Sequence, residues 1–143
     1  MNTTQNTSYA ALILRLALGV MLVAHGLMKV MVFTLPGTVQ FFASVGFPGW
    51  LAYLVVAAEI GGGLLLLAGA MTRQVSLLLV PVMLGAMSVH WHNGWVFSAP
   101  NGGWEYPAFL AVALIVQALL GPGAYAWNSI GRNQPRNHPA TQH

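Results

Sequence analysis

The sequence contains no cysteine and no aspartate, and its only two acidic side chains among 143 residues are glutamates. The absence of cysteine excludes disulfides, thiolate-bound iron–sulfur clusters and dithiol redox relays. A glycine-rich phosphate loop, a Ser/His/Asp set and a zinc-ligand spacing are also missing. The sequence therefore gives no support for a free-standing hydrolase or phosphoryl-transfer enzyme.

Charge of either sign is scarce. Charged residues make up 5% of the chain and hydrophobic residues 57%, whereas a soluble domain has roughly 25% charged residues. A water-soluble protein of this length could not bury so much apolar surface. The net charge of +3 is the balance of five basic and two acidic residues. Because the basic residues are spread over the chain, they form no nucleic-acid-binding patch. The composition indicates a membrane protein whose partner is the lipid bilayer, with no role for nucleic acid.

Four apolar stretches predict four transmembrane helices. Each is close to the ~20 residues that a helix needs to cross a hydrocarbon core of ~30 Å, and in lipid a helix satisfies its own backbone hydrogen bonds. Glycines at 19, 26, 61–63 and 69 predict close helix packing. We expect an all-α polytopic membrane protein, an antiparallel four-helix bundle at residues 9–127, with helices at 9–33, 50–71, 75–91 and 106–127.

The segments outside these stretches are polar or short. Residues 1–8 form a polar N-terminal segment without the basic region of a cleaved signal peptide. Residues 39–42, between the first two helices, predict a short interfacial helix. The turn at 72–74 is short enough to force an antiparallel hairpin. Residues 128–143 predict a disordered cytoplasmic tail.

The basic residues predict the orientation. Four spans place Arg73, Arg132 and Arg136 on the same side as both termini, with Arg15 near that end of the first helix. Lys29 is the basic residue of the opposite side. The positive-inside rule therefore predicts that both termini are cytoplasmic.

Ionisable side chains inside the spans are candidate functional groups, because they are costly in lipid and usually face the bundle interior. Arg15, His25 and Lys29 form one stripe on the first helix. Glu59 lies about 14 Å into the second helix, and Gln117 reaches a similar depth in the fourth. We expect Glu59 to pair with Arg15 or with His25. Such a pair either fixes helix register or handles protons beside a bound molecule.

The histidines allow two further interpretations. His25 and His90 both belong to the half of the membrane away from the termini, and together they could ligate a haem between two helices. Methionines spaced around them would suit copper(I), although ordinary packing explains the same residues. The candidate metal ligands at the outer mouth are Met87, His90, His92 and Glu105.

Several motifs, in order along the chain, resemble the DoxX family of membrane proteins. They are LRLALG (14–19), AHGLMK (24–29), AEIGGG (58–63), LAGAMTR (67–73), MSVH (87–90) and LGPG (120–123). The positions that match are Arg15, Gly26, Lys29, Glu59, Gly62, Gly69 and His90. The resemblance implies a four-helix protein of the bacterial inner membrane. It also implies a link to thiosulfate:quinone oxidoreductase or to membrane redox and oxidative-stress complexes.

Two functional hypotheses follow. In the first, the chain is a quinone-associated subunit of a membrane oxidoreductase or oxidative-stress system. His25, Glu59 and His90 then exchange protons with the quinone, and electrons come from a protein partner or a soluble reductant. The predicted pocket consists of Arg15, His25, Lys29, Glu59, His90 and Gln117. In the second, the chain is a non-catalytic scaffold, or a small-molecule or copper carrier, that recruits a partner protein. A homodimer through lipid-facing small residues is a further expectation.

Overall fold

The structure, a computed structural model, describes residues 2–127 and contains helices but no strands within them. Along the chain the elements are α1 (Thr3–Met31), α2 (Leu35–Ser44), α3 (Leu51–Ala68), α4 (Thr72–His90), the 3₁₀ turn η1 (Trp91–Asn93) and α5 (Glu105–Leu120).

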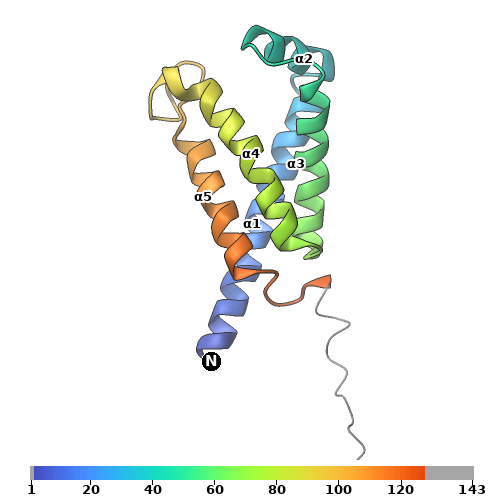
Figure 1. Cartoon of the computed structure of the whole chain (residues 1–143), viewed down its shortest axis with the longest axis vertical. Helices are drawn as coiled ribbons and strands as arrows, with labels where there is room; N and C mark the ends of the chain where they lie inside the picture. The colour runs from blue at the N-terminus through green and yellow to red at the C-terminus, as the bar shows by residue number, and fades with distance from the viewer. Residues whose placement is uncertain (1, 128–143) are drawn as a thin grey trace, which may run out of the picture.

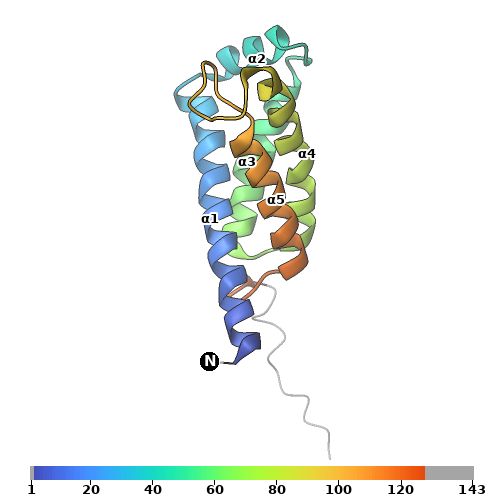
Figure 2. The ribbon, with the colours of Figure 1, turned by 90° about the vertical axis from the view of Figure 1, so that its left-hand side faces the viewer.

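The four long helices form an antiparallel bundle built from two pairs. The most extensive contacts join α1 to α3 and α4 to α5. Helix α2 lies across one end of the bundle, where the loop between α4 and α5 also lies (Figure 1). We call this the α2 end, and we call the opposite end, which carries the short connection between α3 and α4, the turn end (Figure 2). The prediction of an all-α membrane bundle with a short helix between its first two spans is confirmed.

Three helical segments are long and apolar enough to cross a membrane, namely Thr3–Met31, Leu51–Ala68 and Thr72–Asn93. The fourth bundle helix, α5, is apolar but has 16 residues, a rise of about 24 Å. That is shorter than a typical hydrocarbon core of ~30 Å. It nevertheless runs antiparallel beside α4 (Figure 1). The described chain is therefore a multi-pass membrane protein in which α5 is the shortest of the four bundle helices.

Two helix boundaries at the turn end differ from the predicted ones. Helix α1 begins at Thr3, inside the predicted polar segment, because Asn2 and Gln5 form a capping box with distances of 2.9 and 3.1 Å. Helix α5 ends at Leu120, because Gly121 adopts a φ of 81° and Pro122 follows. Residues 121–127 instead cross the turn end, where the Ala124 amide donates to the Ser8 carbonyl at 3.1 Å. The predicted tail lies outside the described residues.

The apolar core lies between the two helix pairs. It draws on α1, α3, α4 and α5, and its members are Leu18, Leu22, Leu66, Val75, Leu79, Met83, Leu110, Ala111, Ala113 and Leu114. The outward-facing side chains of these helices are also apolar and exposed. Apolar residues therefore both fill the interior of the bundle and face the lipid.

Helices α1 and α3 are close because glycines meet at their crossing. A Cβ added to Gly63 would lie 2.9 Å from the Gly19 carbonyl oxygen and 2.7 Å from the Val23 side chain. A Cβ on Gly61 would meet nothing within 4 Å. The predicted role in packing therefore holds for Gly19 and Gly63, whereas Gly61 points away from the bundle.

The two glycines provide a matched test of this contact. We expect Gly63→Ala to lower the free energy of unfolding by about 1–3 kcal/mol, because backbone atoms in its path cannot move aside. We expect Gly61→Ala to be neutral or to stabilise α3 by up to about 1 kcal/mol through helix propensity. Unfolding in mixed micelles, followed by circular dichroism, measures both. Equal effects of the two substitutions would contradict the glycine contact.

Candidate functional site

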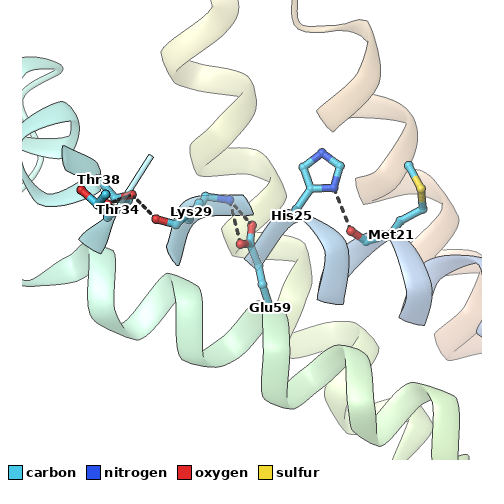
Figure 3. Close-up of polar contacts among 6 residues, drawn as sticks. All are labelled: Met21, His25, Lys29, Thr34, Thr38 and Glu59. Atoms are coloured by element: carbon cyan, nitrogen blue, oxygen red, sulfur yellow. Dashed lines mark hydrogen bonds and ion pairs between the residues drawn. The ribbon is translucent and has the colours of Figure 1, made fainter. Parts of the chain in front are cut away.

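A buried ion pair joins α1 to α3 in the half of the bundle nearer the α2 end. The Lys29 Nζ donates to both carboxylate oxygens of Glu59 at 2.7 Å each (Figure 3). The Glu59 side chain is 3% exposed and the Lys29 side chain 21%. The site therefore holds a buried carboxylate, and its partner is a cation that retains some access to the surroundings.

The local structure around Lys29 holds this pair in place. Gly26 lies against α3, where an added Cβ would come within 3.3 Å of the Glu59 Cβ. One turn further along α1, the Lys29 carbonyl accepts a hydrogen bond from the Thr38 hydroxyl of α2 at 2.9 Å (Figure 3). The same hydroxyl lies 2.9 Å from the Thr34 carbonyl. The end of α1 and the start of α2 are thus tied together beside the ion pair.

The predicted partner of Glu59 was wrong. We expected Arg15 or His25, but the carboxylate binds Lys29. A long side chain on a helix leans toward the N-terminus of that helix. The Lys29 amine therefore reaches back to the level of Glu59, although its Cα lies near the end of α1.

His25 and Tyr106 extend the polar group from α1 to α5. Their rings stack with centroids 5.4 Å apart and an interplanar angle of 24°. The His25 Nδ1 lies 2.8 Å from the Met21 carbonyl (Figure 3). Because a carbonyl only accepts, Nδ1 carries the hydrogen, and Nε2 of the neutral ring is left as an acceptor.

Tyr106 is a site residue that the sequence analysis missed. Its hydroxyl is buried and has no hydrogen-bond partner among the residues that the structure describes. A buried phenol usually finds such a partner, so an unpaired one is a candidate ligand-binding group. The available signal was its place as the first aromatic residue of the fourth apolar stretch.

His90 is the last residue of α4 and contacts the loop at the α2 end. Its Nδ1 lies 3.0 Å from the Asn101 carbonyl. Asn93 donates to the same carbonyl at 3.1 Å and to the Gly102 carbonyl at 2.9 Å. The Glu105 carboxylate accepts the Phe97 amide at 2.7 Å. These contacts fold the loop into a cap over the C-terminal end of α4 and the N-terminal end of α5.

The predicted metal ligands do not come together as one set. Among residues 2–127, no group of three or more His, Cys, Asp or Glu side chains could hold a metal ion. His92 is exposed in η1, and Met87 is half-buried on α4. His90 and Glu105 instead bind the backbone of the loop.

Two residues of the predicted pocket lie at the turn end instead. Arg15 is 1% exposed and its Nη2 donates to the Ala124 carbonyl at 3.2 Å. Gln117 is fully buried and donates to the Gly121 carbonyl at 2.8 Å. The structure therefore pairs Lys29 with Glu59, places His25 one turn away on α1, and separates these residues from Arg15 and Gln117.

An open aromatic groove adjoins the site. Its volume is about 550 Å³, and it is a shallow depression open to the surroundings. Tyr106 is the residue that connects it with His25. The groove is lined by Trp95, Phe97, Trp104, Glu105, Tyr106, Ala108, Phe109 and Val112.

This fold and site define a multi-pass membrane protein with a small polar group inside a helical bundle. The DoxX family model matches residues 10–93, which is more than half of the chain. The protein belongs to the DoxX family, and the resemblance noted in its motifs is confirmed.

Individual relatives agree with this membership. "Putative oxidoreductase CatD" of Bacillus subtilis is 40% identical over 76 residues, which are 53% of this chain and 55% of that protein, so the chain spans about half of its length. "Inner membrane protein YphA" of Escherichia coli is 30% identical over 138 residues, 87% of this chain and 96% of the relative. "Inner membrane protein YqjF" of the same organism is 29% identical over 90 residues, 63% of this chain and 68% of the relative. No solved structure matches this chain significantly.

The unequal burial of the ion pair predicts unequal effects of breaking it. Lys29→Met leaves a carboxylate that is 3% exposed without a partner, and we expect a loss of about 3–5 kcal/mol in unfolding free energy. Glu59→Gln keeps an acceptor for the more exposed amine, so we expect a loss of only about 1–2 kcal/mol.

The double variant Lys29→Met/Glu59→Gln checks this interpretation by unfolding in mixed micelles. It removes both charges and should recover most of the stability that Lys29→Met loses. Strictly additive losses would show that the two side chains do not stabilise each other.

Proposed function

We propose that this protein is a quinone-associated subunit of an oxidoreductase or oxidative-stress system in the bacterial inner membrane. The observation that carries the proposal is the buried Tyr106 hydroxyl, which has no hydrogen-bond partner among the described residues. The ring of the same tyrosine stacks on the imidazole of His25. The Lys29–Glu59 pair, which joins α1 to α3, lies in the same half of the bundle. The name of the CatD relative, a putative oxidoreductase, favours the same class of function.

The residues present suit a quinone head group. A quinone carbonyl accepts hydrogen bonds, and the Tyr106 hydroxyl is a buried donor that lacks an acceptor. The neighbouring groove is lined mainly by aromatic and aliphatic side chains, which fits an apolar molecule that arrives from the lipid. A bound quinone supplies reversible two-electron, two-proton chemistry.

The protein's part in this function is to hold and move protons. His25 has Nε2 available as a proton acceptor, because Nδ1–H is fixed on the Met21 carbonyl. Two hydrogen bonds from Lys29 hold the Glu59 carboxylate in place inside the bundle. The Glu59 carboxylate and the His25 imidazole lie in the same half of the bundle. They are the two groups that would accept and release protons near Tyr106. Because the chain has no cysteine, the proposal assigns electron delivery to a partner protein or a soluble reductant.

A quinone-binding measurement tests the proposal. We expect the protein in a mild detergent to retain a quinone adduct in native mass spectrometry. We expect Tyr106→Phe to weaken quinone affinity about ten-fold, because one hydrogen bond from a buried donor is lost. Tyr53→Phe is the control, since Tyr53 is 53% exposed on α3.

Two results would contradict the proposal. One is a bare subunit mass with lipid alone, and the other is equal quinone affinity of the two tyrosine variants. Either favours the alternative function, a scaffold or a small-molecule or copper carrier that recruits a partner protein.

The proposal includes an orientation in which both termini are cytoplasmic. It rests on the basic residues at 73, 132 and 136 on the side of the termini, against Lys29 on the other side. The absence of cysteine makes single-cysteine labelling direct. A cysteine in the exposed loop, Ser98→Cys, should react with a membrane-impermeant maleimide in spheroplasts. Thr7→Cys, exposed near the start of α1, should react only after permeabilisation. The reverse pattern would place the termini outside.

A further inference from the structure

A buried arginine at the turn end lacks partners for most of its donors. Arg15 is 1% exposed, and its one hydrogen bond in the described chain runs from Nη2 to the Ala124 carbonyl at 3.2 Å. Its Nε and Nη1 are buried with no partner among residues 2–127. A guanidinium stays charged in a protein, and a buried charge without compensation is strongly unfavourable.

The chain has no side-chain carboxylate left for Arg15. Its two acidic residues are Glu59 and Glu105. Glu59 is bound by Lys29, and Glu105 accepts the Phe97 amide in the loop at the α2 end. No side-chain carboxylate of this protein therefore neutralises the guanidinium, and a bound anion would supply the missing negative charge.

Other unpaired polar atoms lie at the same end of the bundle. Thr72 Oγ1 and Ser76 Oγ, near the start of α4, and Gln117 Oε1, near the end of α5, are buried without a partner in the described chain. The three residues are 2%, 0% and 0% exposed. Hydroxyl groups donate to anions readily, and the N-terminus of α4 carries no side-chain cap, so its partial positive charge is uncompensated.

Arg15 lies against the turn between α3 and α4. Its Nη1 packs against Gly69 so closely that a Cβ at position 69 would overlap it. Gly69 begins the turn that leads into α4. A second guanidinium, that of Arg73 in the first turn of α4, lies against Gly121, where an added Cβ would be 3.2 Å from Nε and Nη2. Two arginines thus flank the segment 121–126.

The depth suits a phosphate group. Helix α3 has 18 residues, a rise of about 27 Å, so its end at Gly69 lies near the boundary of the hydrocarbon core. Lipid phosphates occupy this boundary, and arginine side chains near helix ends extend to them. The Ala124 carbonyl, which now accepts from Arg15, is the group that an entering anion would replace.

We propose that the turn end is a binding site for a phosphate group, in which Arg15 provides the counter-charge and Ser76 and Thr72 provide hydroxyl donors. The phosphate belongs either to an anionic lipid headgroup or to a soluble anion. Binding releases the Ala124 carbonyl and holds the ends of α3, α4 and α5 together. This site lies at the opposite end of the bundle from the proposed quinone site and does not depend on it.

Thermal unfolding of the protein in dodecyl maltoside micelles tests the site, with intrinsic tryptophan fluorescence as the signal. The probes are phosphatidylglycerol, phosphatidylcholine and inorganic phosphate, each compared with sodium chloride at equal ionic strength. The variants are Arg15→Met, which replaces the charge with an apolar chain, and Ser76→Ala. Ser88→Ala is the matched control, because Ser88 lies on the same helix near the α2 end and bonds the Gly85 carbonyl.

We expect a saturable rise in the wild-type transition temperature with phosphatidylglycerol or with phosphate. Arg15→Met should abolish it, and Ser76→Ala should weaken the affinity about ten-fold. Ser88→Ala should respond as wild type. Without a ligand Arg15→Met should be at least as stable as wild type, because an uncompensated buried charge is removed. If that variant does not fold, the comparison of the two serine variants decides.

The pattern of responses identifies the source of the phosphate. A response to phosphatidylglycerol without a response to inorganic phosphate assigns the site to a lipid headgroup. A response to inorganic phosphate without one to lipid assigns it to a soluble anion. A wild-type protein that responds to no probe beyond the salt control overturns the proposal, as does an Arg15→Met variant that responds like wild type.

Discussion

The close approach of α1 and α3 is the constraint on which the polar site depends. Gly63 meets the backbone at Gly19, and Gly26 meets α3 beside Glu59. At this separation the Lys29 amine reaches both oxygens of a carboxylate on the neighbouring helix. In lipid, apolar side chains give little preference for one helix contact over another, so small residues and polar pairs define the interface. The glycines bring the helices together, and the ion pair fixes their relative position along the bundle axis.

The polar residues of the bundle separate into two groups with different chemistry. Near the α2 end, Lys29 neutralises Glu59, and His25 stacks on a tyrosine with an unpaired hydroxyl. At the turn end, Arg15 has no carboxylate within the described chain. The first group has no net charge when His25 is neutral and suits an uncharged ligand that shares protons. The second carries a net positive charge and suits an anion. One sequence of low charge content thus contains two distinct candidate sites.

Membership of the DoxX family accounts for the membrane fold but does not identify the function of this chain. The matched region, residues 10–93, contains α1 to α4 with Arg15, Lys29, Glu59 and His90, and it ends before α5. Tyr106 and Gln117 therefore lie beyond it, although each belongs to one of the two polar groups. The match with YphA, which covers 87% of the chain, nevertheless reaches α5.

The sequence by itself determined the membrane environment, the helices and most of their boundaries. These depend on local properties: apolar length, backbone hydrogen bonding in lipid, and the glycines and prolines at helix ends. The extra turns of α1 were missed because a capping box at Asn2 stabilises a polar segment as helix.

The pairing of the charges was decided by the tertiary structure. The spacing of residues along a helix gives the face and approximate depth of a side chain, but not its partner on another helix. That partner depends on the axial offset between helices and on the direction of long side chains. Lys29 therefore replaced Arg15 as the partner of Glu59, and Tyr106 became a site residue, through packing that no single helix encodes.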